Sequence, residues 1–387
     1  MAGALEGVRI LDLTWGVAGP IGVLLLAEQG ADVIKVEPPD GGPFRKTTGS
    51  YVWNRSRRSV TINLQDAEGI ELFLKLLETA DVLVESFRPG VMQKLGLGYD
   101  ALEPRFPRLI YCSVPGYPSN SRHAGRPGYD ALVQARSGEQ YEQPGHRPGP
   151  VFLHTPQPSM ATMYLVSIGI VAALRARELT GEGQHVETSL YQGVLGYTTQ
   201  IWQYSENSTP QSRSMMQKTH PLSIHQASIY ECDDGEWIHA AATSGMTPKK
   251  SPQEILGLPP APSFREMATI SPEERARREE ETRAAYKKCK RDELVEQFHE
   301  NLLGAEAIIP PEEMYAHPQL VANGMVAEVD DPELGPTTQI GLPFTLTRTP
   351  GGVKGPQPLL GQHNSEVFGE LGVTDAQLEG LKAKGVI

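Results

Sequence analysis

The chain has 387 residues, a formal net charge of −12, 39% hydrophobic residues and 21% charged residues. This length predicts a large core, in two domains or in one domain with a sizeable insertion. The acidic balance argues against a nucleic-acid scaffold, which would present a basic face, and we expect no nucleic-acid partner. Three cysteines, at 112, 232 and 289, are too few and too scattered for a disulfide framework or a zinc site, so we expect no metal and a reducing cytoplasm.

The first residues show no basic segment before an apolar one, so we expect no signal peptide. No stretch reaches the roughly 20 apolar residues of a membrane span, so we expect no membrane partner. Apolar runs over residues 8–13, 33–36, 81–85 and 109–114 predict buried strands, and residues 20–29 and 69–79 predict helices between them. This alternation indicates an α/β protein with a parallel, doubly wound sheet, whose ligands bind beyond the carboxyl ends of the strands.

The turn after the first strand, residues 14–20, resembles a dinucleotide-binding motif only loosely. Gly16 and Gly19 are three residues apart, but a flanking glycine is missing, and Pro20 removes an N–H group that would face a phosphate. Glu37 ends the second strand, where an acid that binds ribose would stand. A nicotinamide cofactor is therefore one interpretation, and a tight turn that needs small residues is the simpler one.

Basic residues gather at two places in this acidic chain. Arg55, Arg57 and Arg58 lie within residues 51–63, and Arg88 and Lys94 follow the third predicted strand. A solvated loop would explain the first group, whereas recognition of an anion would explain both, because arginine pairs well with phosphate.

The segment from residue 113 to residue 190 holds a turn-rich loop, a long helix and a strand. His123 is expected to be a surface histidine of the loop, and Asp130 to begin a helix. Residues 161–176 form an apolar run of small residues that predicts a buried helix, which Thr180 to Gly183 would end. Residues 184–190 predict a further strand.

The later part of the chain predicts a second domain. Residues 229–232 and 236–241 predict a hairpin that closes at Asp233-Asp234-Gly235. Residues 271–299 are rich in charged residues at helical spacing and predict exposed amphipathic helices.

Several segments, in order along the chain, are similar to the family III CoA-transferases, a family that includes formyl-CoA transferase and the related α-methylacyl-CoA racemase. The segments are GVRILDLTWGVAGP, LAEQGADVIKVEPP, NRSRRSVTINL, ADVLVESFRPGVMQKLGLGYDAL, RPGYDALVQARSG, GIVAALRARELTGEGQHVETSL, HPQL with GMVAEV, and PLLGQH. The resemblance implies a Rossmann-like large domain with a parallel sheet, a smaller α+β domain and a dimer whose two chains interlock. We place the large domain at 1–200, the smaller domain at 201–325, and a segment that returns to the large domain at 326–387.

The resemblance also implies a binding site for coenzyme A as a substrate, and no tightly bound cofactor. Matching positions would line that site at Val17, Ala18, Pro38, Ile62, Gln65, Ser86, Phe87, Lys94 and Arg126. Pro38 replaces a usual arginine, and Pro127 stands where the family contacts a phosphate, beside Arg126. Since CoA carries a 3′-phosphate and a pyrophosphate, its burial requires nearby cations, which Arg55, Arg57, Arg58, Arg88 and Lys94 would provide.

One departure from the family lies at Ser159. In the family, an aspartate at this position attacks the acyl thioester, forms a mixed anhydride and then carries CoA as an aspartyl thioester. Serine would form a less activated ester and would need a base. No acid stands near Ser159 in the sequence, since Glu139 and Glu142 are the only ones between Asp130 and Glu178. His154 is a candidate base, but no orienting acid is evident, and the simplest interpretation makes Ser159 an N-cap of the helix. The catalytic pair of the racemase, a histidine and the same aspartate, is also absent, because those positions hold Tyr129 and Ser159.

Three hypotheses follow. The chain is one subunit of a heteromeric CoA-transferase whose paralogous partner brings the aspartate, and it transfers CoA between an acyl-CoA and a carboxylic acid. Alternatively, it is a homodimeric acyl-CoA enzyme with altered chemistry, such as isomerisation, hydration or hydrolysis, that uses Ser159, Tyr129 or His154. Thirdly, it is a non-catalytic protein that binds acyl-CoA.

Overall fold

The computed structural model describes residues 3–142, 150–196, 228–241, 247–263, 266 and 269–387. The chain divides into two compact units. Unit 1 comprises residues 1–143, 149–204 and 318–387, and unit 2 comprises residues 144–148 and 205–317. The boundaries expected from the sequence fell after residues 200 and 325.

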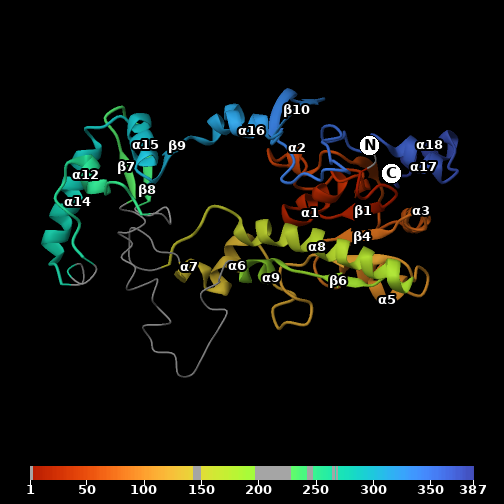
Figure 1. Ribbon diagram of the computed structural model, residues 1–387. Helices are drawn as coiled ribbons and strands as arrows, with labels where there is room; N and C mark the ends of the chain where they lie inside the picture. Colours follow the sequence, from red (N-terminus) through yellow and green to blue (C-terminus); the bar gives the residue numbers. More distant parts are fainter. Residues whose placement is uncertain (1–2, 143–149, 197–227, 242–246, 264–265, 267–268) are drawn as a thin grey trace. The chain divides into compact units, whose positions relative to one another are not determined.

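Unit 1 is built on a parallel sheet of six strands in the order β3-β2-β1-β4-β5-β6 (Figure 1). The sequence therefore predicted the α/β class and the parallel sheet correctly. The strand order reverses between β1 and β4, and ligands of doubly wound sheets bind at such a switch point, outside the carboxyl ends of the strands. The strands are β1 (Arg9–Leu13), β2 (Asp32–Glu37), β3 (Arg58–Thr61), β4 (Val82–Glu85), β5 (Ile110–Ser113) and β6 (His185–Glu187).

Helices connect these strands, and a hairpin of β10 (Val326–Asp331) and β11 (Gly335–Ile340) follows later in the chain. The described residues of unit 1 form the helices α1 (Ala18–Ala27), α2 (Ser50–Trp53), α3 (Ala67–Leu77), α4 (Val91–Lys94), α5 (Tyr99–Leu102), α6 (Asp130–Ser137), α7 (Glu139–Glu142), α8 (Gln157–Thr180), α9 (Leu190–Leu195), α16 (Pro318–Ala322), α17 (Asn364–Glu370) and α18 (Asp375–Ala383).

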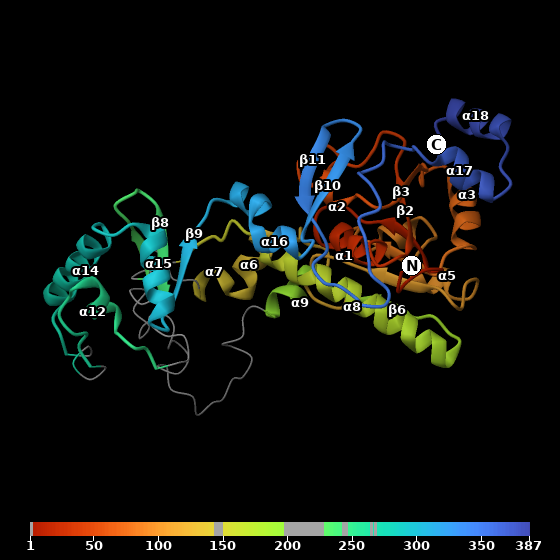
Figure 2. The same ribbon diagram turned by 45° about the horizontal axis from the view of Figure 1, so that its top comes forward.

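The sheet is buried on both faces because helices cover each of them, and successive side chains of a strand point to opposite faces. Ile10 and Val82 pack on one face with α1 and α8, whereas Leu11 and Leu83 pack on the other face with α3. Val367 and Phe368 of α17 and Leu378 of α18 belong to this second core, and Figure 2 shows both helices beside α3. The end of the chain thus completes a core that the first hundred residues begin.

Helix α8 packs closely along α1. A Cβ atom at Gly22 would lie 2.8 Å from Val166 Cβ, and Ser167 Oγ donates a hydrogen bond to the Gly22 carbonyl at 2.8 Å. At the other end of α8, Arg177 Nη2 pairs with Asp81 Oδ1 at 2.8 Å, just before β4 begins. Because the end of α8 lies at the amino edge of the sheet, its first turn lies toward the carboxyl edge.

The sequence predicted the central strands and helices, but not the hairpin of β10 and β11 or the short helices. Three further elements differ from the prediction in extent or were missed. Helix α8 extends beyond residues 161–176 at both ends and stops at Gly181, whose φ of 82° favours glycine. Strand β6 is shorter than residues 184–190, because Ser189 already caps α9. Strand β3 was missed, because the arginines of residues 51–63 gave that segment the appearance of a loop.

Among the described helices, α8 alone has the length and apolar composition of a membrane span. The expectation that no stretch meets these two criteria is therefore wrong. A core helix of a soluble protein meets them as well, and α8 buries Val166, Ile170 and Ala173 in the core that lines the sheet. One such helix is weak evidence for a membrane.

Unit 2 has its own three-stranded antiparallel sheet and core. Strands β7 (Ile229–Glu231) and β8 (Trp237–Ala241) form the hairpin predicted from the sequence, and β9 (Gly304–Ile308) pairs with β8. Tyr230 and Tyr286 stack with ring centroids 3.9 Å apart. The helices are α12 (Pro252–Leu256), α14 (Pro272–Tyr286), α15 (Arg291–Glu300) and a 3₁₀ turn, η3 (Pro311–Ala316). The exposed charged helices predicted at 271–299 correspond to α14 and α15.

Candidate active site

The turns that follow β1 and β4 meet at the switch point of the sheet. The Trp15 N–H donates to Ser86 Oγ at 2.8 Å, and the rings of Trp15 and Phe87 meet edge to face with centroids 5.4 Å apart. Val17 is the N-cap residue of α1 and has no capping side chain, and Ala18 begins the helix. The structure thus brings together four residues expected to contact CoA, namely Val17, Ala18, Ser86 and Phe87.

A buried acid lies directly below this edge. Glu85 ends β4 and accepts a hydrogen bond from the Phe87 N–H at 2.8 Å. Burial raises the pKa of Glu85, against the opposing effect of hydrogen bonds from Ser113 and Phe87. Ser113 Oγ also lies 3.0 Å from His185 Nε2, and burial lowers the pKa of that histidine. Sequence analysis missed this polar chain, because its members stand on three different strands.

Three of the expected cations are exposed on connections that follow the carboxyl ends of strands. Arg88 and Lys94 follow β4, and Arg126 precedes α6. Arg126 also lines a pocket of about 480 Å³ with Arg136 of α6. Burial, and then the positive charges of Arg136, Arg126 and Arg122, lower the pKa of His123. Arg136 is a second cation of this region that sequence analysis missed.

The arginines of residues 55–58 have a structural role, which corrects part of the expected CoA site. The Arg55 side chain is buried against Glu28, with 2.7 Å between Nε and Oε1. Arg57 is buried against Asp12, with 2.5 Å between Nη1 and Oδ2. Neither guanidinium is free to pair with a phosphate, because its charge is already matched inside the core.

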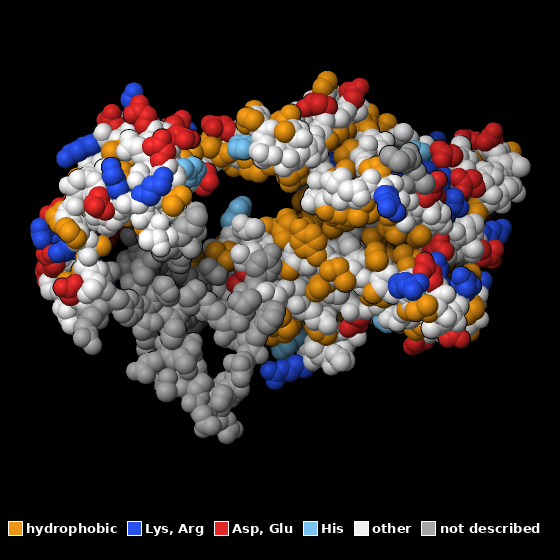
Figure 3. Space-filling model, viewed as in Figure 1, with side chains coloured by type: hydrophobic (Ala, Val, Ile, Leu, Met, Phe, Trp, Pro, Cys, Tyr) orange, Lys and Arg blue, Asp and Glu red, His pale blue; other side chains and the backbone are white. Residues whose placement is uncertain are grey.

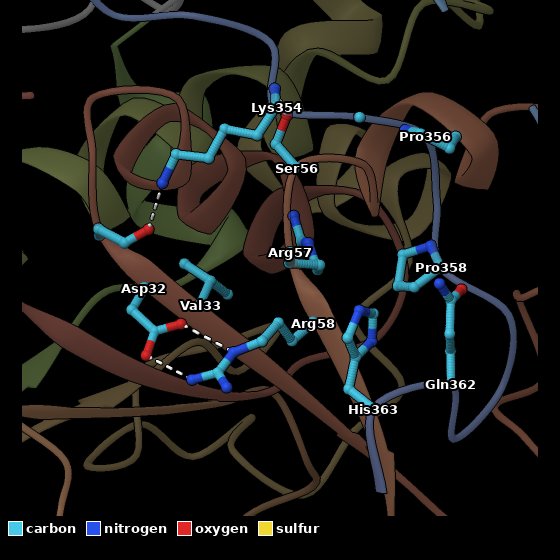
Figure 4. A pocket seen from close by; sticks show the side chains of 12 residues that line it. Asp32, Val33, Ser56, Arg57, Arg58, Lys354, Pro356, Pro358, Gln362 and His363 are labelled. Atoms are coloured by element: carbon cyan, nitrogen blue, oxygen red, sulfur yellow. Dashed lines mark hydrogen bonds and ion pairs between the residues drawn. The ribbon is translucent and has the colours of Figure 1, made fainter. Parts of the chain in front are cut away.

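Arg58 lies at the opposite edge of the sheet from the switch-point residues, because it begins β3 instead of ending it. It lines a pocket of about 330 Å³ in which Asp32 accepts two hydrogen bonds from its guanidinium (Figure 4). Lys354 Nζ, in the same pocket, donates to the Ala31 carbonyl at 3.0 Å. Arg58 is therefore placed away from the expected CoA site.

Two further residues that were candidates for ligand binding are buried inside the protein, which argues against direct contact with a ligand. Ile62 is 1% exposed and belongs to the core shared with α3. Glu37, the candidate ribose ligand of a nicotinamide site, is buried, pairs with Arg45 at 2.5 Å and accepts a hydrogen bond from Ser59 Oγ. Its carboxylate is thus already paired within the protein, which argues against a role in binding ribose.

Ser159 lies in the first turn of α8, directly against a carboxylate. Asp130 accepts two hydrogen bonds from it, from the Ser159 N–H to Oδ1 and from Ser159 Oγ to Oδ2, both at 2.8 Å. The N-cap of α8 is Pro156, which offers no capping side chain, so the expectation that Ser159 is the N-cap is wrong. Asp130 provides the cap instead, from the start of α6. The expectation that no acid stands near Ser159 is wrong for the same reason.

The other two candidate catalytic residues flank this pair. Tyr129 is the N-cap residue of α6 and is 61% exposed. His154 is exposed, and its ring meets Phe152 edge to face with centroids 6.5 Å apart. Within the described part of the chain, the Ser159 hydroxyl donates its hydrogen bond to Asp130 and not to His154. The geometry therefore makes Asp130, and not His154, the residue that interacts with the Ser159 hydroxyl.

The sheet is doubly wound, with its switch point between β1 and β4, and a carboxylate is held at the start of a helix on the carboxyl side. These features define an α/β protein with a candidate ligand site at that edge. Residues 5–364 match the model of CoA-transferase family III. The chain belongs to this family, as the sequence resemblance indicated.

The chain is similar along its whole length to proteins of this family. It is 33% identical to succinyl-CoA:mesaconate CoA-transferase of Haloarcula marismortui, over 96% of this chain and 97% of that protein. It is 30% identical to the succinyl-CoA–L-malate CoA-transferase beta subunit of Chloroflexus aurantiacus, over 99% and 98%. A crystal structure of a CAIB/BAIF family protein from Brucella suis superposes with a TM-score of 0.79 at 28% identity, over 96% of this chain and 100% of that one.

Proposed function

We propose that this chain transfers coenzyme A between an acyl-CoA and a carboxylic acid. Family membership across residues 5–364 supports CoA transfer, and the observation that carries the chemistry is the Asp130 carboxylate at the start of α8. Two relatives are named for succinyl-CoA with mesaconate or L-malate. Succinyl-CoA and short dicarboxylic acids are therefore the substrates to test first.

The CoA site of the proposal lies at the switch point of unit 1. Val17, Ala18, Ser86 and Phe87 would line it, and the exposed Arg88, Lys94 and Arg126, together with Arg136, would pair with its phosphates. Arginine and lysine at such positions form charge-assisted hydrogen bonds with phosphate oxygens.

Reversing two of these charges should weaken CoA binding. We expect the double variant Arg88→Glu, Lys94→Glu to raise the dissociation constant of CoA by about 100-fold, because each of the two lost contacts to a phosphate is worth about 1.5 kcal/mol. Isothermal titration calorimetry measures this constant directly. The matched control, Lys75→Glu with Lys382→Glu, makes the same change of net charge on exposed positions of α3 and α18. Equal affinity in both double variants would refute the assignment.

We also propose that a second chain covers α8, in the interlocked dimer that the family resemblance implies. Several apolar side chains of α8 are exposed, and Figure 3 shows hydrophobic side chains gathered along its course. Exposed apolar patches of this kind mark surfaces that contact another protein. The side chains are Tyr164 (47% exposed), Leu165 (37%), Ile168 (63%), Val171 (45%) and Leu179 (71%).

A charge in the middle of this patch should break the dimer. We expect Ile168→Glu to raise the dimer dissociation constant at least about 100-fold, since burying an unpaired carboxylate costs several kcal/mol. Light scattering coupled to size-exclusion chromatography measures the mass. The control Leu334→Glu changes an exposed leucine, 53% exposed, on the turn between β10 and β11. A wild-type chain that is monomeric at all concentrations would remove this proposal.

The source of the reactive carboxylate separates two forms of the proposed function. In the heteromer hypothesis, a partner chain brings the aspartate. Two observations support it: position 159 holds a serine instead of an acid, and one relative is named as a beta subunit. The contact of Asp130 with Ser159 favours a chain that acts with its own carboxylate. We prefer the second form and place the enzyme in the cytoplasm, which its three free cysteines suit.

An exchange assay with the purified chain alone distinguishes between these two forms. It is incubated with succinyl-CoA and a panel of dicarboxylic acids, and new acyl-CoAs are identified by mass spectrometry. Exchange by the chain alone supports the preferred form, and exchange only after an Asp-bearing paralogue is added supports the heteromer. A changed acyl-CoA in the absence of any acid would point to isomerase, hydratase or hydrolase chemistry. Binding of acyl-CoA without turnover under any condition would leave a non-catalytic binding protein.

A further inference from the structure

We propose that Asp130 is the nucleophile of this chain and carries CoA during the transfer. This inference rests on the proposed function, and it names the residue that acts at the same site. Its starting point is that Ser159 presents both of its donors, the backbone N–H and the hydroxyl, to the two oxygens of the Asp130 carboxylate at 2.8 Å. Position 159 itself has no carboxylate, but Asp130, 29 residues earlier in the chain, places one in contact with it.

Asp130 is better suited than Ser159 to react with a substrate. Ser159 is 3% exposed, whereas Asp130 is only partly buried, so the aspartate is the member of the pair that a ligand can reach. The serine hydroxyl is a donor in this contact and would first have to lose its proton. A carboxylate needs no base to act as a nucleophile, and each of its oxygens keeps one lone pair free after accepting one hydrogen bond.

The start of α8 holds this carboxylate in one orientation. Pro156 offers no capping side chain and Pro158 has no N–H, so the N–H of Ser159 is a donor of the first turn that needs an acceptor. The positive end of the dipole of this 24-residue helix favours a negative charge there. Two hydrogen bonds and the helix end together preorganise Asp130, which is what a nucleophile requires.

The transfer balances in four steps. An Asp130 oxygen attacks the thioester carbonyl, the C–S bond breaks, and a mixed anhydride and CoA thiolate form. The thiolate attacks the aspartyl carbonyl, so that the first acid leaves as a carboxylate and Asp130 carries CoA as a thioester. The acceptor carboxylate attacks this thioester, which again gives an anhydride and CoA thiolate. The thiolate then attacks the acceptor carbonyl, which releases the new acyl-CoA and restores the Asp130 carboxylate. No oxidant, reductant or net proton is needed.

A purely structural role, as a cap of α8, is the competing explanation, and Asp130→Asn separates the two. Asparagine caps helices as well as aspartate does, so the fold should be kept while the nucleophile is lost. We expect the exchange rate to fall at least about 1,000-fold with unchanged thermal unfolding, as removal of a covalent nucleophile does in other enzymes. The matched control is Asp66→Asn, because Asp66 caps α3 through the Glu68 and Gly69 N–H groups and should leave the exchange rate unchanged.

The covalent intermediate gives a second readout. Wild-type chain mixed with succinyl-CoA is quenched in acid and digested with trypsin, which places Asp130 in the peptide 123–136 and Ser159 in the peptide 137–175. We expect CoA as a thioester on peptide 123–136, removed by hydroxylamine with formation of a hydroxamate at Asp130. An acyl group on peptide 137–175 would make Ser159 the nucleophile and would overturn the inference.

The outcomes also distinguish this inference from the proposed function. Full exchange by Asp130→Asn would overturn the inference and leave the CoA-transferase function intact. A wild-type chain that binds succinyl-CoA but never forms the adduct or exchanges CoA would overturn the inference too, because Asp130 would be in place and insufficient. A chain that binds no acyl-CoA, shown by calorimetry with succinyl-CoA and free CoA, would refute the proposed function itself.

Discussion

Replacing Arg57 with methionine should lower the free energy of unfolding by about 3–5 kcal/mol. The Arg57 guanidinium and the Asp12 carboxylate are both fully buried, 2.5 Å apart, and Arg57 Nη2 also donates to the carbonyls of Pro20 and Trp53. Methionine fills much of the volume but leaves the Asp12 charge with Lys35 as its remaining ion-pair partner. Urea denaturation followed by circular dichroism measures the loss.

Arg58→Met is the matched control for this prediction. Arg58 forms more ion pairs than Arg57, with Asp32, Glu366 and Glu370, but these acids are 36–57% exposed. Since exposed pairs are worth about 1 kcal/mol or less each, this variant should lose less stability than Arg57→Met. A smaller loss in Arg57→Met than in Arg58→Met would contradict the structural role of the buried pair.

The same pair predicts how acid acts on the fold. Burial by itself would raise the pKa of Asp12, but Lys35 and Arg57, with the Thr14 hydrogen bonds, outweigh it and hold that pKa below its usual range. A carboxyl with a depressed pKa in the folded state stabilises the fold above its unfolded pKa and loses this effect as the pH falls through its folded pKa. Arg57→Met should therefore unfold at a higher pH than the wild type in an acid titration.

Moving the carboxylate from position 130 to position 159 should restore the exchange activity that Asp130→Asn loses. The two side chains are in hydrogen-bond contact, so an aspartate introduced by Ser159→Asp would place its carboxylate at the same helix end. We expect the double variant Asp130→Asn, Ser159→Asp to exchange CoA at least about 100-fold faster than Asp130→Asn alone, measured with succinyl-CoA under single-turnover conditions.

The control for the rescue is Asp130→Asn with Ser159→Asn, which has nearly the same shape at position 159 and no carboxylate. It should stay as inactive as Asp130→Asn. A rescue by both double variants would show that the carboxylate is not what matters. No rescue by Ser159→Asp, in a chain that still folds and binds CoA, would show that the reacting thioester reaches Asp130 from a direction that position 159 does not share.

The sequence by itself determined the sheet, the long helix and the family. Strands β1, β2, β4 and β5 could be predicted because short, mostly apolar runs that alternate with helical segments are typical of strands buried on both faces. The end of α8 could be predicted because a left-handed residue at Gly181 needs glycine. Each of these signals is local, so a few neighbouring residues contain all of it.

Only the tertiary structure decided which polar groups neutralise one another. Arg57 is paired with an acid 45 residues earlier in the chain, and Asp130 accepts hydrogen bonds from a serine 29 residues later. Arg55, Arg57 and Arg58 therefore resembled a free basic cluster although core and edge carboxylates pair with all three, and Ser159 seemed to lack an acid although one touches it. Periodicity reveals which face of an element is buried, but an ion pair or hydrogen bond between distant residues exists only after the elements have packed, because its strength depends on separation and burial in space and not on distance along the chain.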